Sequence, residues 1–481
     1  MHTPLFPQWR QRLGALGCRV ADIRQQSLLE LELLFGRWLA PHLLSQAEEG
    51  PNSRERVYTL RRTFWGFLFQ ALNPACPCRQ VVHQIQALFA LHNGGKVDGG
   101  TGGFCQARLR LPLEMLQRIR HAVAARVQQH LPEAQQLWQG LSLKVLDGTS
   151  TTLPDTAKNQ RAYPQSRSQK PGCGFPLMKL VAIFSLATGV LLDYAKGNKH
   201  QHELALLDKL LDRFGPRDLV LADRGFSSYV LLALLHLRGV SCLFRLHQAR
   251  PVDFRKGKPL GKDDRLVTWR KPKQKPRYLP QKWWKRVPGE LSVRLVRFRL
   301  QVPGFRSQEV ILVTTLSDPK YSAQEIAQLY ARRWRIELWF RDIKTTKGME
   351  SLRCKTPAMA HKELEMYLIA YNLIRALIVR AGAIHEVPLE RISFKGTADA
   401  ARQYSIAIAR ARTKKKQKEL VADLLRVIAL DEVPERPGRR EPRAVKRRPK
   451  PYPLLNKPRR QFKEIAHRNR YWKNNPRNAK S

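Results

Sequence analysis

Two acidic residues stand where apolar segments of the sequence end, and a third lies within a segment of helical periodicity. Asp147 closes the alternating stretch LSLKVLDG, and Asp223 closes the apolar stretch DLVLAD. Such stretches predict buried strands, so we expect both aspartates to end strands and to meet at one sheet edge, although 76 positions separate them. The third acid, Glu337, lies in YARRWRIELWFRDIK. Each acid alone is better explained by an ordinary turn or surface loop, and the prediction rests on the three together.

The segment around Glu337 predicts a long helix from about residue 322 into the 340s. With a turn of about 100° per residue, four polar residues fall within an arc of roughly 60°. They are Tyr330, Arg333, Glu337 and Lys344. An apolar stripe adjoins them, made of Leu329, Ile336, Phe340 and Ile343. The helix should therefore bury one face and present the polar strip beside it toward the sheet edge that carries the aspartates.

Three converging carboxylates repel one another and raise one another's pKa values unless a cation joins them. Magnesium prefers oxygen ligands and binds through a few carboxylates together with substrate phosphates. Two such ions can activate a nucleophile and stabilise the leaving oxygen of an in-line phosphoryl displacement. Arg333 and Lys344 would then clamp phosphate oxygens. The constellation predicts metal-dependent chemistry on a phosphodiester.

The charge of the chain points to a polyanionic partner. Lys and Arg total 87 against 39 Asp and Glu, which gives a net charge of +48 over 481 residues. Nucleic acid is the expected partner, and an anionic membrane surface is the weaker alternative. No apolar run approaches the ~18 residues of a spanning helix, and the first residues lack a secretory signal. The spacing of Cys76 and Cys78 does not fit a zinc site, and we expect reduced thiols in a cytosol.

The elements around the acids predict a fold of the α+β or mixed α/β class. Three antiparallel strands, a helix, a strand, a helix and a strand match a ribonuclease-H-like core over residues 136–246, which resumes over 306–400. A β-rich insertion, 247–305, interrupts it and is expected to form a small sheet of its own. Residues 1–135 predict a helical DNA-binding region, in which two helices around NPACPCR fit either a helix-turn-helix or a plain helical hairpin.

The C-terminal region, 401–481, is predicted to be basic and largely extended or disordered after residue 434. Residues 436–481 hold 17 Lys and Arg against two acids, and such a composition does not bury enough apolar surface to fold alone. It would either bind DNA or serve as a solvated tail. A further cluster is His200, His202 and Glu203, which we expect to open a helix rather than to hold a metal.

Three motifs in order resemble the insertion sequence 4 family of bacterial DDE transposases. The helix carries the family's Y-R-E-K signature as Tyr330-x2-Arg333-x3-Glu337-x6-Lys344. Asp147-Gly148-Thr149 and Asp223-Arg224-Gly225-Phe226 resemble its first and second aspartate motifs. The stretch TGGFCQARLRLP (101–112) is also similar to its N-terminal region, and the likeness covers roughly residues 50–400.

This resemblance implies a cut-and-paste DNA transposase that acts at terminal inverted repeats and joins the ends to target DNA. Asp147, Asp223 and Glu337 would hold Mg²⁺ or Mn²⁺, two ions in all. The other signature residues would contact phosphates, and an insertion tryptophan would stack a flipped base. For this tryptophan we prefer Trp269 over Trp283 and Trp284, and each is equally explained as a core residue. A homodimer in the synaptic complex, no membrane and a bacterial cytoplasm with nucleoid association are also expected.

Three rival functions remain from the residues alone. A ribonuclease-H-like nuclease or junction resolvase would use the same acids but cut without joining strands. A basic architectural DNA-binding protein would need no acids at all. An RNA-associated protein is suggested by charge alone and leaves the three motifs unexplained.

Overall fold

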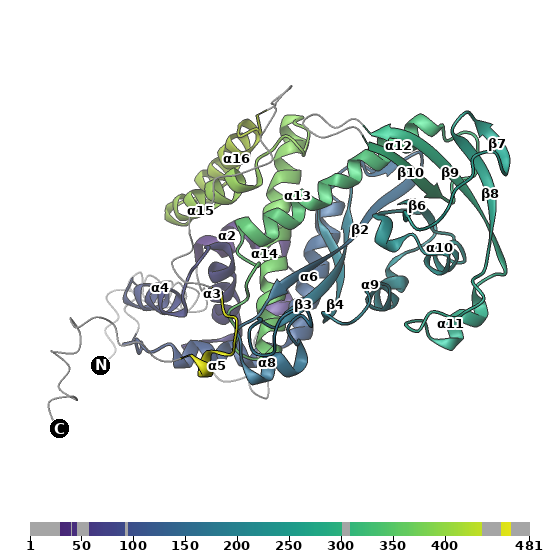
Figure 1. Cartoon of the computed structure of the whole chain (residues 1–481). Coiled ribbons are helices and arrows are strands. Elements are labelled where there is room, and N and C mark those ends of the chain that lie inside the picture. The colour runs from purple at the N-terminus through teal and green to yellow at the C-terminus, as the bar shows by residue number, and fades with distance from the viewer. Residues whose placement is uncertain are drawn as a thin grey trace, which may run out of the picture.

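A ten-stranded mixed sheet crosses the molecule, with helices on both of its faces (Figure 1). The computed structural model describes residues 29–39, 41–45, 57–91, 95–300, 308–434 and 454–462. The strand order is β4-β3-β2-β5-β6-β10-β9-β8-β7, with β1 beside β2. The strands are β1 (Leu137–Trp138), β2 (Leu141–Thr152), β3 (Leu177–Ser185), β4 (Leu191–Asn198), β5 (Asp218–Ala222), β6 (Ser241–Arg245), β7 (Lys258–Gly261), β8 (Asp264–Arg270), β9 (Glu290–Leu300) and β10 (Gln308–Thr314). The predicted mixed α/β class is confirmed.

The succession of elements between residues 141 and 245 is the one that the sequence predicts. β2, β3 and β4 are antiparallel neighbours, and a turn with Gly189 at φ +69° joins the last two. After α9 (Glu203–Leu207) and a 3-10 turn (Asp208–Arg213), β5 returns parallel to β2. After α10 (Tyr229–His236), β6 pairs parallel to β5. The helical crossovers are what parallel neighbours require.

Each face of the sheet buries its own core because successive side chains of a strand point to opposite faces. On β2, Leu143 and Val145 pack into the core that contains α6 (Leu113–Gln128) and α14 (Pro357–His385). Leu146 instead joins the core under α9 and α10. In Figure 1, α14 and α6 lie along the sheet on one side and α9 and α10 on the other. The result is a helix–sheet–helix sandwich.

The long helix α14 is the centre of the larger core. By length and composition it could cross a membrane, but 83% of its apolar window is buried inside the fold. Its polar residues are also buried and paired: Glu365 accepts from Arg120 Nε at 2.9 Å and from the Tyr194 hydroxyl at 2.8 Å. These are the features of a soluble core helix rather than of a membrane span.

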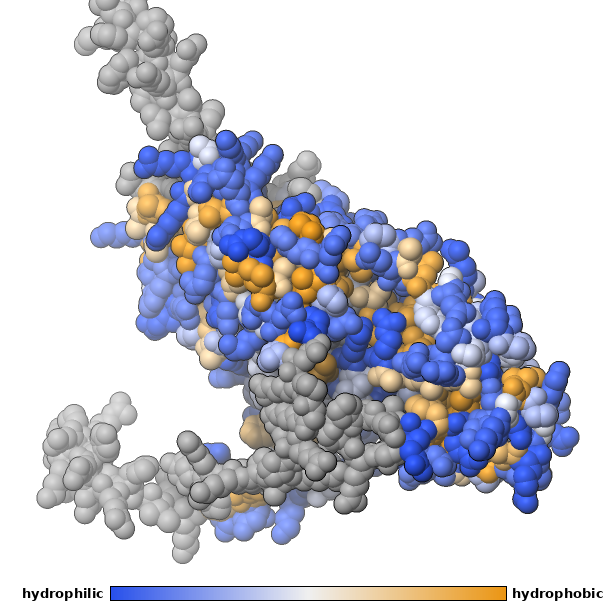
Figure 2. All heavy atoms as spheres, turned by 90° about the horizontal axis from the view of Figure 1, so that it is seen from above, coloured by the Kyte–Doolittle hydropathy of each residue, from blue (hydrophilic) through white to orange (hydrophobic). Residues whose placement is uncertain are grey.

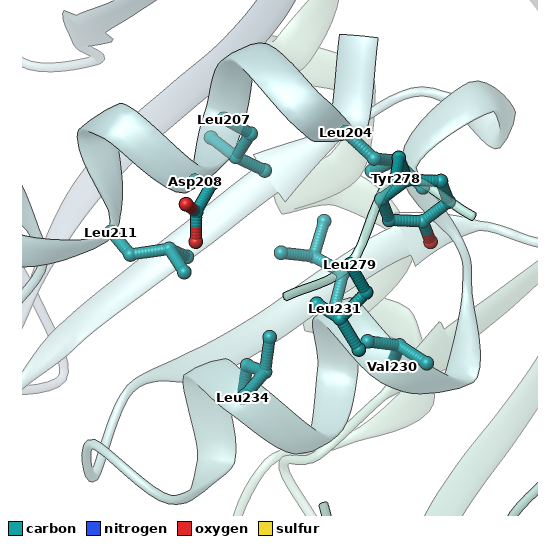
Figure 3. Close-up of a pocket in the computed structure, with 9 residues that line it drawn as sticks. All are labelled: Leu204, Leu207, Asp208, Leu211, Val230, Leu231, Leu234, Tyr278 and Leu279. Atoms are coloured by element: carbon teal, nitrogen blue, oxygen red, sulfur yellow. The ribbon is translucent and has the colours of Figure 1, made fainter. Parts of the chain in front are cut away.

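The insertion does not form a separate small sheet, which corrects the prediction. β9 pairs with β10 over seven residues, and β8 and β7 follow outward, so the insertion extends the central sheet. A buried ion pair, Arg294 Nε to Asp264 Oδ1 at 2.8 Å, fixes β8 to β9. The insertion also contains a short helix, α11 (Gln281–Arg286). Figure 3 shows Tyr278 and Leu279 of the insertion closing an apolar pocket between α9 and α10.

Further α-helices belong to the N- and C-terminal regions, and one more, α8, lies between β2 and β3. They are α2 (Leu29–Phe35), α3 (Leu60–Leu72), α4 (Cys78–Leu91), α5 (Gly102–Arg110), α7 (Glu133–Gln136), α8 (Ala157–Ala162), α15 (Phe394–Arg410) and α16 (Lys414–Leu430). Residues 401–430 are mostly helical, and the predicted extended or disordered chain concerns only the residues after 434. Most of the basic tail lies outside the described residues. Its described piece, 454–462, brings Pro458 against Gly172. Figure 2 shows hydrophilic side chains over most of the face seen from above, as the net charge requires.

Candidate active site

The register of the sheet places Asp147 beside Asp223. β2 and β5 are parallel, and their last paired residues are Leu146 and Ala222, so the two aspartates come next on neighbouring strands. Neighbouring strands lie about 4.8 Å apart. Asp223 follows the end of β5, as predicted, but Asp147 does not end β2, which continues to Thr152 beside β3. Asp147 therefore lies inside a strand at the point where its parallel neighbour stops.

Both aspartates lie on the face of the sheet that packs toward α14. Leu143 and Val145 share that face on β2, and Leu219 and Leu221 share it on β5. Because every second side chain of a strand points to the same face, residues 147 and 223 belong to this face as well. The Oδ1 atoms of both accept from local backbone: Asp147 from Gly148 N at 2.7 Å and Asp223 from Gly225 N at 2.9 Å. Their second oxygens are left for other partners.

The helix that carries Glu337 is segmented rather than regular. It runs as α12 (Ala323–Ala331), a 3-10 turn (Arg332–Trp334), α13 (Arg335–Arg341) and a π-helical turn (Asp342–Thr346). A capping box between Ser322 and Glu325 begins it. The predicted apolar stripe is confirmed, because all four of its members are buried: Leu329, Ile336, Phe340 and Ile343. The π turn changes the residues-per-turn count before Lys344, so a regular helical wheel no longer describes that position.

Arg333 joins Asp147 to Glu337. Its Nη1 lies 3.7 Å from Asp147 Oδ2, and its Nη2 lies 3.6 Å from Glu337 Oε1. The Arg333 side chain is only 9% exposed, whereas that of Glu337 is 45% exposed. Arg333 Nε is buried without a hydrogen-bond partner. The guanidinium therefore stands between a buried acid and a solvent-facing one, with donor capacity to spare.

The carboxyl group of Asp147 lies in surroundings that disfavour its charged form. Its pKa is raised to about 7, mainly by burial; the charges of Asp223 and Glu337 also raise it, whereas the Gly148 amide and Arg333 lower it. Both other acids thus act on Asp147 through space. An acid in this setting is readily ionised when a cation arrives, because the cation supplies the missing compensation.

Tyr330 lies beneath the same cluster. Its side chain is buried, its hydroxyl has no hydrogen-bond partner, and its ring lies 5.7 Å from the Arg333 guanidinium carbon. Burial raises its pKa to about 12, Arg333 and Arg245 lower it, and Asp223 raises it. The phenol therefore stays protonated near neutral pH and can donate a hydrogen bond.

The comparisons with known proteins agree with this geometry. Residues 138–373 match the protein family described as the transposase DDE domain. Over 441 residues the chain is 28% identical to the transposase InsG for insertion sequence element IS4 of Escherichia coli K12, a span of 90% of this chain and 96% of that protein. The chain is a DDE transposase. Its likeness over nearly its whole length is to the insertion sequence 4 type.

Shorter matches reach other transposases of Escherichia coli. The putative transposase InsZ is 30% identical over 103 residues, which are 21% of this chain and 34% of that protein. The transposase for insertion sequence element IS421 is 38% identical over 69 residues, 14% of this chain and 19% of that protein. A DDE transposase acts on DNA and depends on divalent metal, so the predicted partner and the general cofactor class are confirmed.

The acids fit a divalent cation, although not as one closed cage. Within the described ranges, no group of three or more His, Cys, Asp and Glu side chains is close enough to hold an ion as it stands. Asp147 and Asp223 lie at matching positions of neighbouring strands. Glu337 is connected to Asp147 through Arg333, which lies close to both carboxylates. Magnesium needs few protein ligands because waters and phosphates complete its shell. The oxygen-only donors and the uncompensated Asp147 suit that ion.

Trp269, which we predict to stack a flipped base, does not lie on the surface of this structure. Its side chain is buried in the core of the insertion, and Arg250 lies over its ring at 3.9 Å. Trp283 and Trp284 on α11 are half-buried, with Arg238 and Lys271 over their rings at 4.7 and 4.2 Å. Strand β8 alternates its side chains, and Trp269 falls on the inward side.

Lys344 is half-buried in the π turn.

The transposase site contains one further residue that the sequence analysis did not name, Arg245. Arg245 follows Phe244, which pairs with Ala222, so Asp147, Asp223 and Arg245 form one row across three strands. Glu203 lies on the opposite face, where a Cβ at Gly148 would meet its Oε1 at 2.9 Å. His202 caps α9 by accepting from Leu204 N, so the cluster opens a helix as expected. Because this row depends on strand register, no local pattern in the sequence marked Arg245.

Proposed function

We propose that this transposase moves its insertion sequence by a cut-and-paste pathway, with strand cleavage at terminal inverted repeats followed by transfer to target DNA. The observation that carries the proposal is the row of Asp147 and Asp223 at one sheet position, tied to Glu337 through Arg333. The strand order β4-β3-β2-β5-β6 supports a ribonuclease-H-like core. The two parts of that core would be residues 136–246 and 306–400, with a helical DNA-binding region before them.

Asp147, Asp223 and Glu337 would hold the divalent cations, Mg²⁺ or Mn²⁺ and two in number. Bound there, the cations supply an activated nucleophile and charge stabilisation at the scissile phosphate. Water is the nucleophile for the first cut, and the freed 3′-hydroxyl is the nucleophile for transfer. Asp147 is ready to ionise on metal binding, since its pKa is raised to about 7 mainly by burial.

The remaining signature residues would bind the DNA backbone. Arg333 has an unpartnered Nε, and Tyr330 has an unpartnered hydroxyl, so each keeps a donor for a phosphate oxygen. Lys344 would add a second positive charge from the π turn. Terminal-repeat DNA and target DNA are the proposed substrates. A homodimer would bring two such sites together in the synaptic complex, in a bacterial cytoplasm close to the nucleoid.

The test separates catalysis from binding. Glu337→Gln keeps the size of a side chain that is half exposed, and we expect end cleavage with Mg²⁺ to fall by about 10²–10³-fold or more while binding of terminal-repeat DNA survives. Glu114→Gln, an exposed substitution at the start of α6, is the matched control and should leave both unchanged. Cleavage that persists in Glu337→Gln would remove Glu337 from the catalytic set.

The same acids would also serve a nuclease that cuts without joining, which is the second candidate. A pre-cleaved DNA end with a free 3′-hydroxyl distinguishes the two functions, because it bypasses the first cut. The transposase forms a joined product with target DNA in Mg²⁺, whereas the nuclease yields none.

A further inference from the structure

Three of the cysteines gather around one buried arginine, far along the chain from the three acids. Arg108 on α5 is buried, and its Nη2 donates to Cys78 Sγ at 3.2 Å and to Cys105 Sγ at 3.5 Å. Its Nη1 donates to Gln70 Oε1 at 3.1 Å. A buried guanidinium usually has a carboxylate partner. Here its closest acceptors are two thiols and an amide.

The two thiols are close to each other. Cys105 Sγ lies 4.0 Å from Cys78 Sγ, and the two residues belong to different helices, α5 and α4. A disulfide needs about 2.0 Å between its sulfurs, so the two sulfurs must approach by about 2 Å to form one. Both cysteines are partly exposed and both are free.

A cavity gives small molecules access to this pair. It has a volume of about 500 Å³ and lies where α3, α4 and α5 meet the start of α14. Cys78, Cys105 and Arg108 line it together with Cys354. The cavity is large enough for a small organic disulfide to approach the sulfurs. Burial raises the pKa of the Cys78 thiol, and the Arg108 guanidinium at the cavity wall opposes that rise, so the cation makes the attacking thiolate more accessible than burial alone would allow.

We propose that Cys78 and Cys105 form a reversible thiol–disulfide site that a low-molecular-weight disulfide oxidises, with Arg108 as the residue that activates it. Cys78 gives up its proton to solvent, and its thiolate attacks the small disulfide, forming a mixed disulfide and releasing one thiolate. Cys105 then loses its proton and attacks the Cys78 sulfur, which expels the second thiolate. The two protein thiols lose two electrons, and the small disulfide gains them as two thiols.

The oxidised site would hold the N-terminal helices differently. The bond fixes the first turn of α4 to α5, and it takes from Arg108 the two acceptors that compensate its charge. Gln70 alone would remain close to the guanidinium. The disulfide therefore couples the redox state of the surroundings to the packing of α3, α4 and α5 against α14.

The experiment uses the full-length chain and glutathione disulfide as the oxidant. After incubation, free thiols are blocked and peptides are mapped by mass spectrometry, with and without reductant. We expect a Cys78–Cys105 linked peptide that disappears on reduction. Cys173→Ser, in a surface loop, is the matched control and should form the same link. Only glutathione adducts, or a link from Cys78 to Cys76 or Cys354, would overturn the assignment.

The role of Arg108 has its own readout. Arg108→Gln should slow formation of the link by about tenfold or more, because a neutral amide favours the thiolate less. Arg108→Lys keeps the charge and should restore much of the rate, which tests the idea even if the glutamine variant folds poorly. Equal rates in all three proteins would show that the arginine does not activate the pair.

Discussion

Replacing Asp147 by asparagine should make the protein more stable at alkaline pH while it abolishes cleavage. In the folded chain burial raises the pKa of Asp147 to about 7 from its ordinary 3.8. The folded state therefore holds a proton that the unfolded chain releases. The resulting penalty on folding is absent below pH 4, grows as the pH rises through that interval, and is constant above pH 7.

The size of the effect follows from the shift. About three pKa units at 1.36 kcal/mol each set a ceiling of about 4 kcal/mol at pH 8. Asparagine carries no charge, so it escapes this penalty, but it also loses the 3.7 Å contact with Arg333 at every pH. Comparing the stability difference between the two proteins at two pH values cancels the loss of the Arg333 contact, because that loss is the same at both. Between pH 5 and pH 8 the advantage of Asp147→Asn should grow by about 2–3 kcal/mol.

Urea unfolding of the wild type and of Asp147→Asn at pH 5 and pH 8, without and with Mg²⁺, measures this growth of the stability difference. Asp155→Asn, at an exposed carboxyl on the loop after β2, is the control and should show no such growth. Mg²⁺ should narrow the gap at pH 8, because the cation stabilises the ionised wild-type site and not the amide. A gap that is the same at both pH values would refute the electrostatic account of the site.

Three other substitutions test single contacts. Gly148→Ala places a Cβ 2.9 Å from Glu203 Oε1 and should cost about 1 kcal/mol in urea unfolding, a loss that Glu203→Ala in the same chain relieves. Lys347 is buried, and burial lowers its pKa to about 7. The folded state therefore loses stability relative to the unfolded chain as the pH falls from about 10 to 7, because the unfolded lysine is already charged in that interval. Lys347→Met should gain more stability at pH 7 than at pH 9.5. Trp269→Ala should lower the free energy of unfolding by about 3 kcal/mol because the ring is buried under Arg250, while Trp269→Phe should keep end cleavage near the wild-type rate. Cleavage lost in the phenylalanine variant without loss of stability would restore a DNA-stacking role.

The chemistry of the site could be read from the sequence because it depends on residue types and local spacing. Apolar alternation located β2 and a continuous apolar stretch located β5. The stripe through Leu329 and Ile336 located the buried face of the Glu337 helix. Three ordered motifs identified the family. Those signals lie within one element each, where period and composition suffice.

Positions that depend on partners from elsewhere in the chain were decided only by the tertiary structure. Whether β7, β8 and β9 form their own sheet or extend the central one depends on pairing with β10, which no local pattern encodes. The burial of Trp269 and the row that adds Arg245 to the aspartates depend on strand register. The local sequence around Asp147 indicated which residues could react. The packing of distant strands and helices decided which of them meet, because strand register and burial depend on neighbours that are far away in the chain.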